Sequence, residues 1–281
     1  MNRLRRRSIH VLEALFNYAV LMGGVAFALF PLLWMLSTSL KTEGDYFADP
    51  PVWIPRTLDL SHYLYLFTKT DGLLSLKNSL ILALATMLAA LVFSIPMAYA
   101  IARFQVGGRK LPMSILMLRM MHPIALVFPL FLLYRQFRLL DTYSSLILTY
   151  TVIYLPFAIW LLIGFFRDFP LEIEEAAMID GCSRLSALLR VVLPIVAPGI
   201  AVVALFAFVF TWNEFLFAVI FTKQHTKTMM VLTASFIQSP TDTAWGEAAA
   251  AVIVGIFPCV SLTFFLQRYL VRGLALGSVK G

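Results

Sequence analysis

Residues 168–194 read DFPLEIEEAAMIDGCSRLSALLRVVLP, a polar segment between two long apolar runs. Pro170 favours a helix start, because its missing N–H would be unpaired there in any case. The first turns then hold three acidic residues, Glu172, Glu174 and Glu175. Carboxylates are favoured there by the positive end of the helix macrodipole. Asp180-Gly181 ends the helix, since glycine readily adopts the left-handed conformation of a C-cap.

A second short helix is predicted over residues 184–191, with Ser183 as its N-cap and Pro194 opening the next apolar run. The two helices would form a compact knob on one face of a membrane. A charged loop kept in water would explain the acids. It would not explain the small side chains of Ala176-Ala177 followed by Gly181. Small side chains let another surface approach closely, so we interpret the knob as a docking surface.

The chain as a whole is too apolar for a water-soluble protein. Its 281 residues are 60 % hydrophobic and 13 % charged, with a mean hydropathy of +0.86. Soluble domains are about 45–50 % apolar and about 25 % charged. This composition excludes a soluble enzyme, a disordered chain and a fibrous protein. Cys182 and Cys259 are too few for a disulfide scaffold, and the net charge of +7 fits basic loops at a membrane surface better than nucleic-acid binding.

Six apolar runs are flanked at both ends by charged residues. Each run is near or above the roughly 20 residues that an α-helix needs to cross about 30 Å of hydrocarbon. The sequence therefore predicts an all-α integral membrane protein of one domain, residues 1–281. The six predicted transmembrane helices lie near 12–39, 77–104, 111–136, 143–167, 194–222 and 246–270. A loop at 41–76 and the loop at 168–193 are the long connections.

The distribution of basic residues sets the predicted orientation. Thirteen Lys and Arg residues fall on the N-terminal side of the membrane and eight on the other side. By the positive-inside rule, both termini are cytoplasmic and residues 41–76 lie outside. The first apolar run is longer than the roughly 7–15 residues of a signal-peptide core, which favours an uncleaved helix.

The outside loop has two interpretations. Its aromatic stretch, His62-Tyr63-Leu64-Tyr65-Leu66-Phe67, is typical of an interfacial amphipathic helix. The same stretch also fits a docking surface for a partner outside the cell, and the residues do not favour either reading.

The loop at 168–193 carries a specific resemblance. Glu175-Ala176-Ala177, Gly181, Val191, Leu193 and Pro194 resemble the signature loop of ABC importer permeases, with Val191 in place of the usual Ile and Cys182 in place of Ala. Further stretches are similar to maltose-type sugar permeases of the carbohydrate-uptake class: 57–63, Leu66-Phe67, Asn78-Ser79, 98–104, Gly108-Arg109, 212–215 and the tail 277–281.

The resemblance implies that this loop is a coupling helix which inserts into a groove of a cytoplasmic ATPase. The coupling residues it implies are Glu174, Glu175, Ala176, Ala177, Asp180, Gly181 and Cys182. It also implies a second homologous permease, two copies of an ABC ATPase that hold ATP and Mg, an extracytoplasmic solute-binding protein and a sugar substrate. No cofactor is expected on this chain, which would lie among lipids in a bacterial or archaeal inner membrane. Glucosides, disaccharides, polyols and glycerol phosphates are all carried by permeases of this appearance.

Two polar groups are predicted within the membrane, in the third and fifth helices. Burying Arg119 there costs about 2.5–3.5 kcal/mol even on lenient insertion scales, so it should face the bundle or a wet cavity. With His122 it either lines the substrate pathway or binds backbone carbonyls or Glu214 as a structural tie. Trp212, Asn213 and Glu214 together offer an aromatic face, an amide and a carboxylate, the groups that commonly bind sugars.

Motifs for chemistry on this chain are missing. The sequence has no Gly-Lys pair and therefore no P-loop, so ATP would have to be hydrolysed by another chain. No catalytic residue or metal site is predicted, and the four histidines lack ligand spacing. The alternatives to an importer subunit are an ion-coupled secondary transporter, for which only Glu214 could serve as the coupling carboxylate, and a membrane scaffold without transport.

Overall fold

The computed structural model describes the chain at residues 2–108, 110–237 and 244–277, with side chains at 13–108, 110–237 and 244–267. Arg109 and residues 278–281, which belong to the quoted motifs, lie outside these ranges. Throughout the described ranges the regular secondary structure is helical. The elements are α1 (Asn2–Thr38), α2 (Glu43–Tyr46), α3 (Ser61–Thr68), α4 (Gly72–Phe104), α5 (Lys110–Leu118), α6 (Pro123–Gln136), α7 (Tyr143–Asp168), α8 (Leu171–Ile179), α9 (Arg184–Ala187), the π-helical turn η1 (Leu188–Val192), α10 (Leu193–Trp212), α11 (Leu216–Phe221), α12 (Met229–Ile237) and α13 (Trp245–Gly277).

The helices supply the spans that the sequence predicted. In the described residues, five are long and apolar enough to cross a membrane: Glu13–Thr38, Gly72–Phe104, Tyr143–Asp168, Arg184–Trp212 and Trp245–Gln267. The pair α5 and α6, bent by 77° at the break between them, passes the same test together and is the candidate for the sixth span. The predicted all-α membrane fold is thus confirmed. Contacts divide the chain into two compact units, residues 1–71 with 233–254 and residues 72–232 with 255–281. The single domain over 1–281 stays a prediction.

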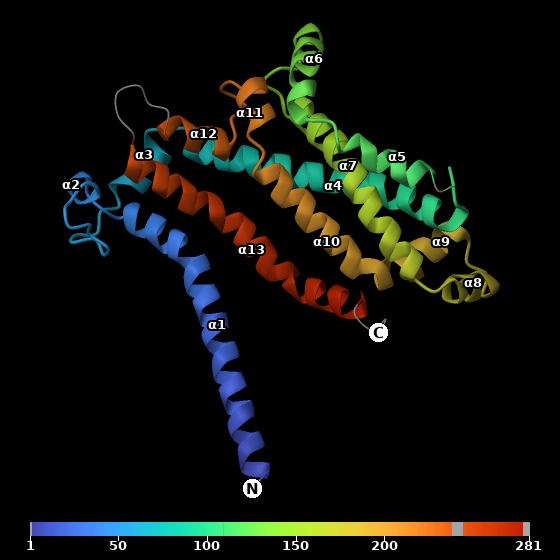
Figure 1. The fold of residues 1–281 in the computed structure, drawn as a ribbon. Helices are drawn as coiled ribbons and strands as arrows, with labels where there is room; N and C mark the ends of the chain where they lie inside the picture. Colours follow the sequence, from blue (N-terminus) through green and yellow to red (C-terminus); the bar gives the residue numbers. More distant parts are fainter. Residues whose placement is uncertain (1, 109, 238–243, 278–281) are drawn as a thin grey trace. The chain divides into compact units, whose positions relative to one another are not determined.

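The larger unit is built on α4, α7 and α10, which pack together (Figure 1). Alanines in the core between these helices let the backbones approach closely, as is usual for helices in lipid. Ala90, Ala98, Ala158 and Ala207 belong to this core and are all fully buried. The glycine at 199 has the same role. A Cβ there would collide with the ring of Phe165, so α7 and α10 could not pack as they do.

The third span differs from the continuous helix predicted over 111–136, because α5 ends at Leu118 and α6 begins at Pro123. Pro123 has no N–H to continue the ladder and disfavours helical backbone at His122, which is extended at φ −66° and ψ 126°. Before it, the N–H groups of Arg119, Met120 and Met121 bond three residues back in a tightened turn. The proline therefore breaks the span instead of only bending it.

The fifth predicted helix, 194–222, is also divided, into α10 and α11. Glu214 lies at the division. Its carboxylate accepts the backbone N–H groups of Phe217 at 3.0 Å and Ala218 at 3.2 Å, and so caps the start of α11.

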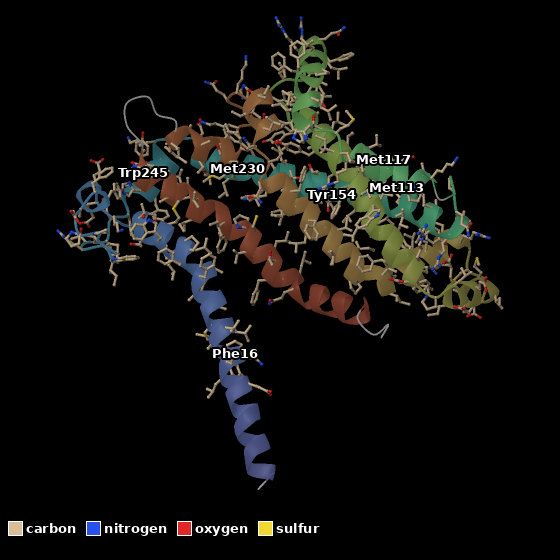
Figure 2. The ribbon with its side chains drawn as sticks, in the orientation of Figure 1. Phe16, Met113, Met117, Tyr154, Met230 and Trp245 are labelled. Atoms are coloured by element: carbon tan, nitrogen blue, oxygen red, sulfur yellow. The ribbon has the colours of Figure 1, made fainter. Side chains whose placement is uncertain are left out.

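The smaller unit contains α1, α2, α3 and the first part of α13, up to residue 254. Over its span Glu13–Thr38, α1 buries none of its residues within the chain, and Phe16 is an example of its exposed apolar side chains (Figure 2). The segment after α1 folds around His62, whose Nε2 lies 2.8 Å from the Tyr46 hydroxyl and 3.0 Å from the Lys41 carbonyl. His62 Nδ1 lies 3.4 Å from Glu247 Oε1 of α13.

Candidate functional site

The helix α8 and the bend after it follow the predicted course. Pro170 is the N-cap residue of α8, and Glu172 and Glu174 lie in its first turn. The bend at Gly181 has φ +91°, a left-handed conformation that side chains with a Cβ rarely adopt. Its neighbour Cys182 donates its N–H to the Ala177 carbonyl at 3.0 Å. Ser183 then caps α9 by accepting the N–H of Ser186 at 3.3 Å.

The predicted coupling residues divide into an inward and an outward set. Glu175, Ala176, Asp180 and Gly181 are exposed, whereas Ala177 and Cys182 are half-buried. Sequence reasoning missed two apolar side chains in the same loop, Ile179 at 86 % and Leu185 at 65 % exposed. An exposed surface of small, acidic and apolar side chains is suited to a protein partner.

Glu174 is turned inward, toward α4, and is only 2 % exposed. Its Oε2 lies 3.0 Å from Arg103 Nε, and its Oε1 accepts the hydroxyl of Tyr99. Arg103 also donates to the Phe169 carbonyl at 2.9 Å and lies over the Phe169 ring, 5.3 Å from its centre. These contacts attach the start of α8 to the end of α4.

Arg119 lies at the break of the third span. Its guanidinium is 4.6 Å from the centre of the Phe157 ring of α7, a cation–π contact. The residue is exposed within this chain, as is His122, which is the N-cap residue of α6 but makes no side-chain capping bond there.

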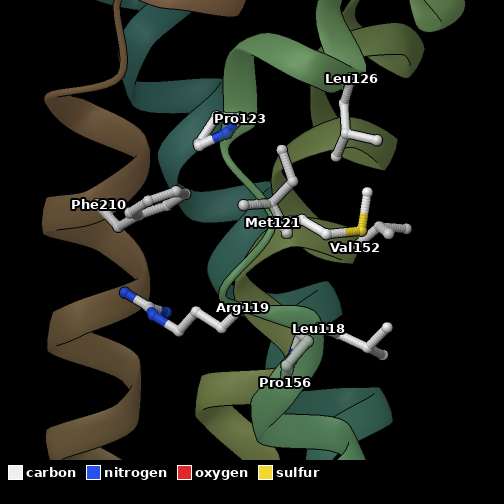
Figure 3. A pocket seen from close by; sticks show the side chains of 9 residues that line it. Leu118, Arg119, Met121, Pro123, Leu126, Val152, Pro156 and Phe210 are labelled. Atoms are coloured by element: carbon white, nitrogen blue, oxygen red, sulfur yellow. The ribbon is translucent and has the colours of Figure 1, made fainter.

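A cavity of about 360 Å³ opens beside this break. Figure 3 shows Arg119, Met121 and Pro123 from the broken span and Phe210 from α10 around it. The complete lining is Leu118, Arg119, Met121, Pro123, Leu126, Val152, Ile153, Pro156 and Phe210. Arg119 is the one charged residue among these nine side chains.

The structure gives Trp212, Asn213 and Glu214, the predicted sugar-binding cluster, separate partners within the chain, and their role in binding a sugar stays a prediction. Trp212 is buried, stacks on Phe208 and donates its Nε1–H to the Gly255 carbonyl at 2.9 Å. Asn213 donates its amide N–H to the Val209 carbonyl at 2.8 Å. Besides capping α11, Glu214 accepts the Tyr150 hydroxyl at 2.7 Å. These contacts of Trp212 and Glu214 thus connect α10 and α11 to neighbouring helices, while Asn213 is exposed.

A polar clamp on the connection between α11 and α12 was not foreseen from the sequence. The carboxylate of Asp141 accepts backbone N–H groups from all four residues 223–226 at 3.0–3.2 Å. It also accepts the Thr226 hydroxyl at 2.9 Å. Partial burial works to raise the pKa of Asp141, but these hydrogen bonds prevail and lower it to about 2.

Asn78 and Ser79 of α4 complete the clamp. The Asn78 amide donates to the His225 and Lys227 carbonyls, both at 3.0 Å, and accepts the Tyr143 hydroxyl at 2.6 Å. Ser79 accepts the N–H of Met229 at 2.8 Å. The Asn-Ser pair was noted in the sequence only as a resemblance. Neither it nor Asp141 carries a local signal for contacts with residues so distant in sequence.

Solved structures identify the fold. A bacterial ABC transporter involved in the import of the acidic polysaccharide alginate matches 92 % of this chain and 96 % of its own, with a TM-score of 0.78 at 21 % identity. At that level of identity, the likeness shows the fold alone.

Sequence comparison identifies the family. Residues 90–276 match the family described as "Binding-protein-dependent transport system inner membrane component". The sulfoquinovosyl glycerol permease SmoH of Agrobacterium fabrum is 37 % identical over 90 % of this chain and 89 % of its own length. The trehalose/maltose permease MalG of Thermococcus litoralis is 34 % identical over 96 % of this chain and 99 % of its own length. The trehalose permease SugB of Mycobacterium tuberculosis is 36 % identical over 92 % of this chain and 94 % of its own length. The chain therefore belongs to the family of binding-protein-dependent transport system inner membrane components.

Proposed function

We propose that this chain is the permease subunit of an ATP-driven ABC importer that moves a sugar or sugar-like solute inward across the cytoplasmic membrane. Family membership supports the importer. The names of the relatives, which are permeases for trehalose, maltose and a sulfonated sugar glycoside, support the substrate class. The chain does no covalent chemistry in this proposal, and its helices alternate between inward-open and outward-open arrangements.

The observation that carries the proposal is the surface of α8 and its bend. Glu175, Ala176 and Asp180 are exposed there, while Glu174 is buried against α4. A partner that docks on the exposed face therefore moves a helix that is firmly attached to a membrane span. The left-handed bend at Gly181 allows the close approach that a groove in the partner requires.

The partners that we propose follow from this role. Two copies of an ATPase bind ATP and Mg and dock on the coupling residues, one copy on α8 of this chain. A second homologous permease covers part of the exposed apolar surface, and lipid covers the rest. An extracytoplasmic solute-binding protein delivers the sugar. Both termini are cytoplasmic in a bacterial or archaeal inner membrane, as the distribution of basic residues favours.

The test is transport in proteoliposomes containing the affinity-purified native complex. Uptake should require ATP and the binding protein, and should persist when proton and sodium gradients are abolished. Uptake driven by an ion gradient without ATP would refute the importer and favour the secondary transporter. Subunits identified by mass spectrometry should include a different permease and an ATPase at two copies.

A pair of charge reversals tests the docking surface. Glu175→Lys should abolish ATP-driven uptake and lower recovery of the ATPase, because it places a cation on the exposed face of α8. Glu172→Lys is the matched control, since Glu172 is also exposed on α8 but lies in the first turn, away from the bend. Equal uptake by both variants would remove Glu175 from the docking surface.

A further inference from the structure

The charge of Arg119 is not neutralised within the described part of the chain. Its guanidinium lies over the Phe157 ring, and the ion pairs of the described residues do not include it. The intramembrane acid that could have done so, Glu214, is satisfied by Tyr150 and the start of α11. A guanidinium in a membrane span is stabilised by an anion, by backbone carbonyls or by water, and an anion is the partner that also neutralises its charge. Arg119 therefore lacks its counter-charge.

The cavity beside Arg119 has room for a small ligand, and its lining side chains offer hydrogen-bond donors but no oxygen acceptors. Its volume of about 360 Å³ lies within the usual range for small-molecule sites. Eight of the nine lining side chains are apolar, and Arg119 offers five N–H donors and no acceptor. A ligand polar group that matches this lining must accept hydrogen bonds without needing to donate them.

The break in the span adds to the preference for an anion. The 14-residue helix α6 begins at Pro123, which lines the cavity, so its positive end lies on the cavity wall. Arg119 and this helix end thus contribute positive potential to the same space. The lining contains no side-chain carboxylate or amide that could accept the hydroxyl protons of a neutral sugar.

We propose that Arg119 binds the anionic group of an acidic sugar, a carboxylate, sulfonate or phosphate, as the solute passes the break between α5 and α6. The Phe157 ring holds the guanidinium in place, and Phe210 packs on the carbon face of the sugar. This inference rests on the proposed function, since it names the substrate class of the same importer.

The experiment uses the complete transporter with its binding protein in proteoliposomes, and probes in pairs that differ only in the anionic group. Glucuronate with glucose, 6-sulfoglucose with glucose, and a glycerol phosphate with glycerol are suitable pairs. The measured quantity is the ratio of anionic to neutral uptake in each variant relative to the wild type. Because the binding protein is unchanged, its own preference cancels in this comparison.

Arg119→Gln should lower anionic uptake by about 10- to 100-fold, the effect of losing a charge-assisted hydrogen bond, and leave neutral uptake nearly unchanged. Arg119→Lys should keep most of the preference for the anion. Arg135→Gln is the matched control, because Arg135 is an exposed cation of the same broken span outside the cavity. It should leave the ratio unchanged.

Each outcome decides between the proposals. If the wild type imports none of the anionic probes with ATP, the anion site is refuted, whereas the proposed function is decided separately by whether uptake needs ATP or an ion gradient. If the wild type imports only neutral probes with ATP, the importer stands and the anion site is refuted. If Arg119→Gln lowers anionic and neutral uptake alike, Arg119 is a structural contact with a protein carboxylate and the proposal is overturned. The same conclusion follows if Arg119→Gln prevents assembly and acidic probes do not compete with uptake by the wild type.

Discussion

Replacing Arg103 by methionine should release α8 from α4. The ion pair of Arg103 with Glu174 has a 3.0 Å contact, and its side chains are only 10 % and 3 % exposed. Removing one partner of such a buried pair costs about 3–5 kcal/mol, because the other charge is left without compensation. Tyr99 continues to donate to Glu174, so we expect about 3 kcal/mol. That value corresponds to a roughly 100-fold shift toward the undocked helix.

Hydrogen exchange of the purified complex in nanodiscs measures this shift directly. The amides of residues 171–179 should exchange roughly 100-fold faster in Arg103→Met, with uptake reduced in parallel. Arg184→Met is the control, since Arg184 is an exposed cation that lies over the Phe104 ring at the same end of the molecule. The double variant Arg103→Met/Glu174→Gln should recover part of the protection, because it leaves no buried charge. Wild-type exchange in Arg103→Met, or a double variant no better than the single one, would refute the reasoning.

Three further substitutions test other parts of the chain. Asp141→Asn should lower stability at pH 7 by about 1 kcal/mol after allowance for solvent screening. The pKa of the carboxylate is lowered from 3.8 to about 2, so its contribution to stability is present above pH 4 and is lost as pH falls through 2. The Tm difference between the variant and the wild type should therefore shrink on acidification. A Tm difference that does not change with pH would contradict the assignment. Gly181→Pro should abolish uptake without loss of membrane insertion, since proline cannot adopt φ +91°; normal uptake would exclude the bend from coupling. Gly246→Ala should lower stability by about 1–3 kcal/mol, because the added Cβ collides with Tyr46 and His62, and an unchanged Tm would show that this packing is not tight.

The spans and the knob were predictable because they depend on local patterns. A run of about 20 apolar residues between charges is sufficient to identify a membrane helix. The Pro170, Gly181 and Ser183 signals likewise act within a few residues, and the structure has a helix start, a left-handed bend and a cap at these positions.

The direction in which polar side chains face was not predictable, because it depends on distant partners. Glu174 and Glu175 are adjacent acids with the same local signal, yet α4 binds the first and leaves the second exposed. Glu214 was predicted as a sugar-binding residue from its type and its neighbours in sequence. Its carboxylate accepts hydrogen bonds from the Tyr150 hydroxyl and from N–H groups of α11. A continuous helix was predicted over 111–136, whereas the helix is broken before Pro123, because the preceding turn tightens as well.

In the proposed importer, the buried position of Glu174 makes α4 part of the route by which α8 acts on the membrane spans. Through the backbone, α8 is joined only to α7 before it and to α9, η1 and α10 after it. The residues of α4 are more than 60 positions away in the sequence, so a movement of α8 reaches them only through non-covalent contacts, and the Arg103–Glu174 pair is a short, buried one. At the other end of α4, some 40 Å away at 1.5 Å per residue, Asn78 and Ser79 hold the connection between α11 and α12. We infer that force applied to α8 by the proposed ATPase reaches that connection along α4, since a packed helix shifts as a unit and hydrogen bonds near 3 Å cannot lengthen far without breaking.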